Sequence, residues 1–171
     1  MKSLHLRLTP LLLCAGLALA ACGSDSNDNS ADSSDADRVV TVEHGAVPAP
    51  VYVDLGDEGA SVGDQRIFHF DGTSNGVTVP MDWVMTTTAV DEPEPGVETR
   101  VASAVFQLDG LDSTLLLEGT GWYPSDGSTF EMSSTLVRAI TGGTGEYTGA
   151  SGRVESTRNA DDTWTHVFYV D

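Results

Sequence analysis

The chain has 171 residues, and its 26 acidic residues outnumber its 8 lysines and arginines, which gives a formal net charge of −18. Such an acidic surface makes nucleic acid and bare anionic lipid poor partners, so no nucleic-acid function is expected. Lys2 is the only lysine. Because it lies in the first residues, a mature domain without them has no lysine for a Schiff base or a general base.

Residues 1–21 have the pattern of a secretory signal peptide. Lys2 and Arg7 precede an apolar run that is too short to span a bilayer. The sequence Leu19-Ala20-Ala21-Cys22 resembles the bacterial lipobox, in which the cysteine is acylated and becomes the first mature residue. We therefore expect an extracytoplasmic lipoprotein, held at the cell membrane by a lipid anchor on Cys22. Ordinary cleavage, with Cys22 as a bystander, is the alternative.

Residues 22–37 follow as a tether rich in serine, aspartate and asparagine, a composition that predicts disorder. Loss of Lys2 and Arg7 leaves six basic residues against 26 acidic ones, a formal charge of −20 for the mature chain. Cys14 leaves with the signal peptide, so no intramolecular disulfide is expected. Residues 38–171 are enough for one domain with a sizeable core.

Nine segments of this domain are rich in valine, threonine and aromatic residues, which predicts strands. They are Arg38–Glu43, Val51–Leu55, Gln65–Phe70, Gly76–Thr87, Thr99–Asp109, Ser113–Trp122, Thr129–Thr141, Gly152–Thr157 and Thr163–Val170. No segment after Cys22 has a helical apolar period, so the domain is predicted to be all-β. The loops 71–75, 91–96 and 125–128 consist of turn residues and predict hairpin connections. This pattern fits a barrel and a sandwich equally.

A glycine-rich stretch connects two of these predicted strands. Glycines at positions 142, 143, 145, 149 and 152 surround Tyr147. They predict two tight turns, with the tyrosine ring fixing the loop to the sheet. A phosphate-binding loop would need a following helix, whereas Arg153–Thr157 alternates like a strand.

Two segments resemble one family. Ala139–Gly152 resembles the late hairpin of the allene oxide cyclase and dirigent-protein barrels, and Gly59–Phe68 resembles their early turn into a strand. The resemblance covers about Val39 to Asp171. It implies a single antiparallel, calycin-like β-barrel of about eight strands, with a pocket at one mouth. It also places Asp82 about where the plant cyclases carry a pocket cysteine, so a relative with another substrate, or with none, is expected.

The family resemblance also suggests site residues. Six polar residues interrupt strand sequence: Glu43, Asp82, Arg100, Glu118, Arg138 and His166. A charge on the inner face of a barrel must be paired or lie in a pocket. Dirigent-like pockets use arginine and aspartate to steer an electron-rich substrate. By that resemblance Arg138 and Asp82 are the candidate catalytic pair, with Glu118 as the other possible carboxylate.

The remaining candidates for the ligand pocket are Glu43, Tyr52, Glu118 and Trp122, with Trp83 as a further aromatic wall. Met81, Trp83 and Met85 share one face of their strand, opposite Asp82. Both faces are partly apolar, so the pattern leaves open which one is inside. A surface position for the carboxylates and an ordinary core position for the aromatic rings are the alternatives.

No metal site and no cofactor are expected. The histidines His44, His69 and His166 lack metal-ligand spacing. The chain has no Gly-x-Ser-x-Gly elbow, which argues against an α/β-hydrolase. Four carboxylates crowd one loop region without the ligand order of a calcium loop, which indicates a solvated acidic loop: Asp54, Asp57, Glu58 and Asp64.

Three classes of function remain open. The first is a cofactor-independent enzyme, isomerase-like or cyclase-like, which shapes a reactive intermediate inside the barrel. The second is a carrier lipoprotein for a small apolar or aromatic ligand, and the third is a structural surface lipoprotein with a filled barrel. An open cavity would favour the first two, because function depends on the site rather than on the fold.

Overall fold

The computed structural model describes residues 36–127 and 129–171. The predicted signal peptide, Cys22 and most of the predicted tether lie outside the described residues. Across the described ranges, no helix is long and apolar enough to cross a membrane.

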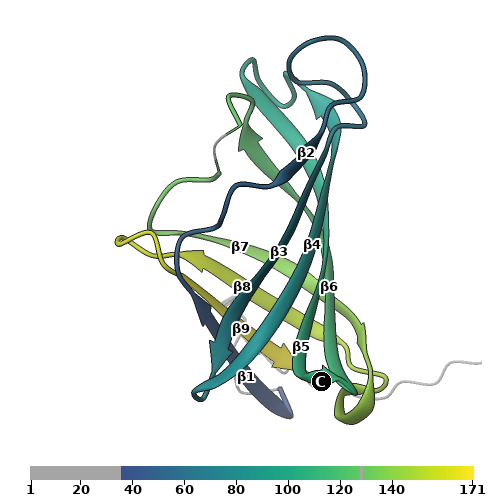
Figure 1. Ribbon diagram of the computed structural model, residues 1–171, viewed down its shortest axis with the longest axis vertical. Coiled ribbons are helices and arrows are strands. Elements are labelled where there is room, and N and C mark those ends of the chain that lie inside the picture. The colour runs from purple at the N-terminus through teal and green to yellow at the C-terminus, as the bar shows by residue number, and fades with distance from the viewer. Residues whose placement is uncertain (1–35, 128) are drawn as a thin grey trace, which may run out of the picture. The chain divides into compact units, whose positions relative to one another are not determined.

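The described part of the chain is built from nine antiparallel strands, drawn in Figure 1. They are β1 (Arg38–His44), β2 (Val51–Val53), β3 (Gln65–Ser74), β4 (Val77–Val90), β5 (Val97–Leu111), β6 (Ser113–Pro124), β7 (Ser134–Gly143), β8 (Gly152–Arg158) and β9 (Trp164–Val170). All nine predicted strands are present. The main difference is β7, which begins five residues later than the pattern predicts, because residues 129–133 belong to the loop after β6.

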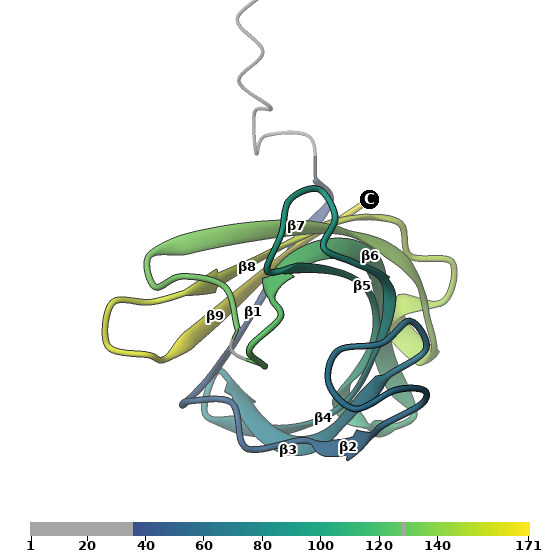
Figure 2. The ribbon, with the colours of Figure 1, turned by 90° about the horizontal axis from the view of Figure 1, so that it is seen from above.

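The strands form a closed eight-stranded barrel with one extra strand. The sheet order is β1-β9-β8-β7-β6-β5-β4-β3-β2, and a pairing of β1 with β3 at Glu43 and Thr73 closes it. The short strand β2 lies outside this circle and pairs with β3 alone. The view along the barrel in Figure 2 shows the ring of strands. The predicted all-β barrel is confirmed, and the sandwich alternative is wrong.

Two of the ladders end before the strands do. β6 pairs with β7 only from Leu115 to Glu118, so no residue pair joins Gly119–Pro124 to β7. On the other side, β3 pairs with β1 at Thr73 and with β2 at residues 65–67, and no pair joins it to the chain between these points. The interruption beside β6 lies at the end of the barrel where β5 begins, and the one beside β3 lies in the middle of that strand.

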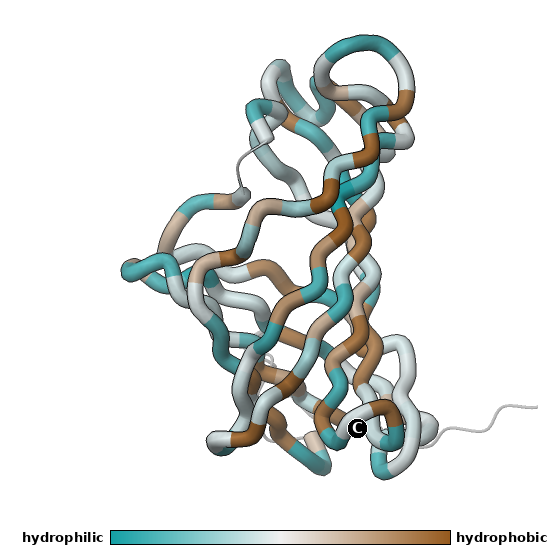
Figure 3. The backbone as a smooth tube through the Cα atoms, viewed as in Figure 1, coloured by the Kyte–Doolittle hydropathy of each residue, from teal (hydrophilic) through white to brown (hydrophobic). Residues whose placement is uncertain are grey.

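Hydrophilic and hydrophobic residues alternate along the strands, as the colours of Figure 3 show. The apolar residues of this alternation form the buried core. Met81 and Trp83, which were predicted to share one face of β4, face inward and pack with Phe106 of β5. Leu115 and Leu117 of β6 fill the same region and are fully buried. This apolar core occupies the end of the barrel where β4 and β6 begin.

The glycine-rich stretch forms the connection between β7 and β8, as predicted. It contains the short 3-10 helix η2 (Gly145–Tyr147), and Tyr147 is buried in the core. Gly145 has a φ of +58°, and a Cβ there would lie 2.0 Å from the carbonyl oxygen of Asp112. Only glycine therefore permits the loop to approach β6 this closely.

The acidic loop before β3 is organised around one carboxylate. Asp64 accepts hydrogen bonds from the backbone N–H groups of Leu55 and Ser61 and from the hydroxyl of Tyr52. These bonds hold the pKa of Asp64 below its usual range, despite an opposing effect of desolvation that is the largest single contribution. All three groups that donate hydrogen bonds to Asp64 therefore belong to the protein itself.

Candidate ligand-binding cavity

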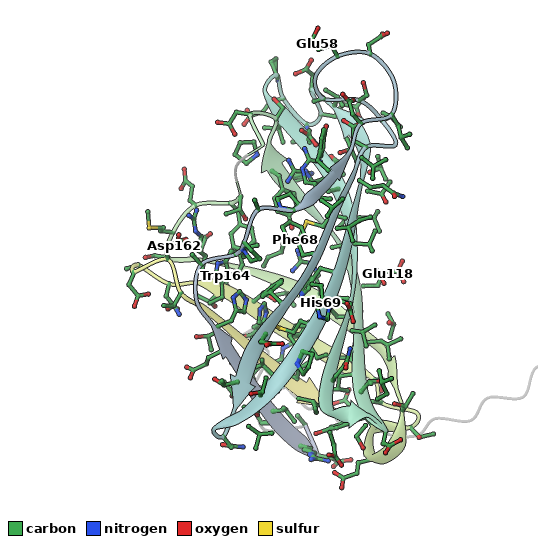
Figure 4. The ribbon with its side chains drawn as sticks, viewed as in Figure 1. Glu58, Phe68, His69, Glu118, Asp162 and Trp164 are labelled. Atoms are coloured by element: carbon green, nitrogen blue, oxygen red, sulfur yellow. The ribbon has the colours of Figure 1, made fainter. Side chains whose placement is uncertain are left out.

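The barrel contains a cavity of about 270 Å³ beyond the apolar core. Aromatic rings form much of its wall, among them Phe68 of β3 and Trp164 of β9, which are labelled in Figure 4. Two loops complete it. One is the segment Val47–Pro50 between β1 and β2, and the other contributes Phe130 after β6. One part of the barrel interior is therefore filled by the apolar core, and another part is an open cavity.

Arg138 of β7 lies in this wall and is 4% exposed. Its Nη2 donates a 2.6 Å hydrogen bond to the hydroxyl of Tyr123, and its guanidinium lies 5.5 Å from the ring centre of Trp83. Gly119 on β6 makes room for it, because a Cβ there would lie 2.9 Å from Cγ of Arg138. Burial lowers the pKa of Arg138, and the neighbouring Tyr123 opposes that shift.

A buried ion-pair cluster contributes two more arginines to the cavity wall. Glu98 of β5 is fully buried and accepts bonds from Arg66 at 3.2 Å, Arg100 at 3.0 Å and the hydroxyl of Thr87 at 2.8 Å. Arg100 also lies over the ring of Tyr123, with 4.6 Å between the guanidinium carbon and the ring centre. The cluster and Arg138 thus meet at this tyrosine, which contacts Arg100 through its ring and Arg138 through its hydroxyl.

Two histidines meet at the inner end of the cavity. Nε2 of His44 lies 3.0 Å from Nε2 of His166, and Nδ1 of His166 lies 2.8 Å from the hydroxyl of Ser156. Nδ1 of His44 lies 2.6 Å from the carbonyl oxygen of Gly45. A carbonyl can only accept, so this nitrogen donates and Nε2 of neutral His44 accepts from His166. Nδ1 of His166 then accepts from Ser156, and the chain of bonds is consistent with two neutral rings.

The surroundings keep both rings neutral. Desolvation lowers the pKa of His44 below its ordinary 6.5, although the bond to the Gly45 carbonyl opposes it. The pKa of His166 lies well below 6.5, first because the ring is buried and then because His44 and Arg138 repel a second positive charge. In a neutral histidine one ring nitrogen donates and the other accepts, and the bonds described above engage all four nitrogens of the pair.

Three buried donors on the cavity wall have no partner in the described part of the chain. They are Nε of Arg138, Nε1 of Trp83 and Nε1 of Trp164. All three residues line the cavity. An unpaired buried donor is costly, so such groups are normally satisfied by water or by a ligand.

The structure separates the two residues proposed as a catalytic pair. Arg138 lies inside, whereas Asp82 lies on the outer face of β4 with 49% of its side chain exposed. Its carboxylate accepts bonds from His69 at 2.7 Å and Gln107 at 3.0 Å. Strand alternation explains this position, because Met81 and Trp83 on either side point inward.

The other predicted pocket residues also lie away from the cavity wall. Glu43 and Glu118 are exposed, and Figure 4 shows Glu118 pointing away from the barrel. Trp122 is 65% exposed. Tyr52 on β2 is 44% exposed and bonds Asp64, which raises the pKa of Tyr52 to about 12. For Glu43 and Trp122 the neighbouring strand positions are buried instead, whereas β2 with Tyr52 lies outside the closed ring.

Sequence reasoning missed several residues of the wall. His44 was considered only as a metal ligand, and His166 was noted as a polar strand residue without a role in the site. The two lie 122 residues apart and meet at the cavity. Among the described residues, no group of three or more histidine, cysteine, aspartate or glutamate side chains could hold a metal ion. Glu98 fell just outside the predicted strand, and the alternation from Glu98 through Arg100 to Ala102 was the signal that could have placed it inside.

Comparison with known proteins gives a fold and no family. No family model matches the chain, and no curated protein matches it. Among solved structures, the chain is similar to one described as Pyocyanin demethylase, with a TM-score of 0.58 and 21% sequence identity. The match covers 78% of this chain and 100% of that one. At this identity the likeness shows the β-barrel fold alone.

Proposed function

We propose that this domain binds a small, largely apolar or aromatic molecule inside the barrel. The main observation in favour is the cavity with aromatic walls. Its volume of about 270 Å³ is small for a ligand site. The presence of this space argues against a structural barrel with a filled interior. We further propose that the protein acts outside the cytoplasm, anchored to the membrane by lipid on Cys22, and that it belongs with the allene oxide cyclase and dirigent-like barrels.

An enzymatic role is the second candidate. It is favoured by the pair His44 and His166, because histidine is the commonest general acid or base and both rings line a largely apolar cavity. Together with Arg138 this arrangement suits an isomerase-like or cyclase-like step, in which a proton moves and no cofactor is needed. The catalytic assignment predicted for Arg138 remains part of this proposal, whereas the position of Asp82 gives it no support.

The tryptophans of the cavity provide a direct test of binding. The full mature chain with Cys22→Ser, which needs no detergent, is titrated with the neutral probe N-phenyl-1-naphthylamine while tryptophan fluorescence is recorded. We expect saturable quenching with one probe per chain. The response should shrink in Trp83→Phe and Trp164→Phe, because both rings line the cavity. If no apolar or aromatic probe gives a saturable response, the binding function is refuted.

A further inference from the structure

The charges of the cavity wall are opposite in sign to the charge of the whole protein. The chain carries a formal charge of −18, yet the cavity is lined by Arg66, Arg100 and Arg138. No aspartate or glutamate of the described residues lines it. Glu98, behind this wall, bonds Arg66 and Arg100 and compensates one of the three positive charges.

Arg138 is the guanidinium that this cluster leaves without a carboxylate partner among the described residues. Its hydrogen bond goes to the phenol hydroxyl of Tyr123, and its Nε has no partner. A buried cation is strongly disfavoured unless an anion or several acceptors compensate it. Arg138 is 4% exposed, so bulk water compensates little of its charge.

A continuous run of ring contacts links Arg138 to the two tryptophans that carry the other unpaired donors. The guanidinium of Arg138 lies 5.5 Å from the ring centre of Trp83, the ring of Trp83 lies 5.6 Å from that of His166, and the latter lies 6.2 Å from that of Trp164. The guanidinium of Arg138, which lines the cavity, offers a ligand N–H groups that can only donate. Acceptor oxygens on the ligand would satisfy them.

We propose that the ligand is a compact aromatic carboxylate whose acid group binds Arg138 in the cavity, while its ring packs among the aromatic walls. This rests on the proposed binding function and names the chemical class of the ligand. A carboxylate matches the planar fork of a guanidinium and forms charge-assisted hydrogen bonds with it. A long alkyl chain suits the site less well, because the cavity is small and its walls are largely rings.

A pair of probes that differ only in charge tests the proposal. The mature chain with Cys22→Ser is titrated at neutral pH with naphthalene-2-carboxylate and with the neutral naphthalene-2-carboxamide. We expect the carboxylate to bind at least tenfold more tightly than the amide. In Arg138→Met, which removes the charge and keeps an unbranched side chain, this preference should fall to less than threefold while the amide still binds.

The control variant is Arg153→Gln, which removes an arginine from β8 that pairs with Glu155 and lies over Tyr169 outside the cavity. It should keep the full preference for the carboxylate. Retained binding of the amide shows that Arg138→Met is folded and that its cavity is intact. Should Arg138→Met lose binding of both probes, its melting temperature and circular dichroism separate misfolding from an effect on the site, and Arg138→Gln repeats the comparison.

Each remaining outcome would overturn a different part of the proposal: the ligand class, the binding residue or the binding function. Equal affinities of the two probes for the parent chain would refute the anionic ligand and leave the proposed binding function in place. A carboxylate preference that survives both substitutions of Arg138 would show that the acid group binds elsewhere. If neither these probes nor N-phenyl-1-naphthylamine bind, the binding function fails and the ligand class fails with it.

Discussion

Buried ionisable groups are concentrated in one half of this barrel. Glu98 sits between two arginines, and His44 and His166 share a hydrogen bond that leaves both rings neutral. Such groups are costly to bury, and replacing them with apolar residues of similar volume is often stabilising. Their presence is consistent with a site that has been kept polar for binding or chemistry rather than for stability.

The histidine pair predicts a loss of stability at acidic pH. Both rings have a lowered pKa in the folded protein, whereas the unfolded chain titrates near 6.5. As the pH falls below that value the unfolded state binds more protons, so the free energy of unfolding decreases until the folded pKa is reached. The slope is at most about 1.4 kcal/mol per pH unit for each histidine. Melting temperatures between about pH 7.5 and 5.5 measure it.

The double variant His44→Gln, His166→Gln should flatten this dependence. His69→Gln, which removes an exposed histidine from the outer face of β3, is the matched control and should keep most of it. A parent-like slope in the double variant would assign the acid sensitivity to other groups.

At the scale of elements, the loop between β7 and β8 depends on a glycine for a reason that the sequence gives only in part. Positive φ was expected at several of its glycines, and Gly145 and Gly149 both have it. They differ in their surroundings, since a Cβ at Gly145 would overlap the backbone of Asp112 whereas one at Gly149 meets nothing within 4 Å. The pair therefore separates backbone strain from steric overlap.

We predict that Gly149→Ala lowers the free energy of unfolding by about 1–2 kcal/mol, the usual penalty for an L-residue in the left-handed region. Gly145→Ala should cost about 1–3 kcal/mol more, because the loop must also move away from β6. Urea unfolding of both variants gives the comparison. Equal losses would mean that the loop absorbs the overlap without cost.

Much of the fold could be predicted from sequence, and less of the site could. Strands were predictable because alternation and turn residues are local signals, and the β7–β8 loop because its glycines are closely spaced. The site required knowing which face of each strand is inside. On β4 both faces are partly apolar, so Asp82 and Trp83 could not be assigned. Contacts such as that between His44 and His166 depend on the closed barrel and leave no local pattern.

At the scale of the whole molecule, the prediction concerns where in the cell the protein is located. We predict that the protein is processed as a lipoprotein, because Leu19-Ala20-Ala21-Cys22 ends an apolar run and an acidic tether follows. Cys22→Ala should release the protein from the membrane fraction or block its processing, and globomycin should cause the precursor to accumulate. Membrane fractionation and the mass of the product measure this. A Cys22→Ala protein of unchanged mass that still sediments with membranes would refute the anchor.

The interrupted ladders beside β6 and β3 have a kinetic consequence. Where no residue pair joins two strands, opening a path between the outside and the cavity would break no sheet hydrogen bonds. Pro48 and Pro50, in the segment beside β3, lack the N–H that could extend that ladder. Entry and exit then require only side-chain and loop movements of nanoseconds to microseconds. The residence time of a ligand is thereby set by its contacts in the cavity, and a very stable barrel can still exchange its contents rapidly.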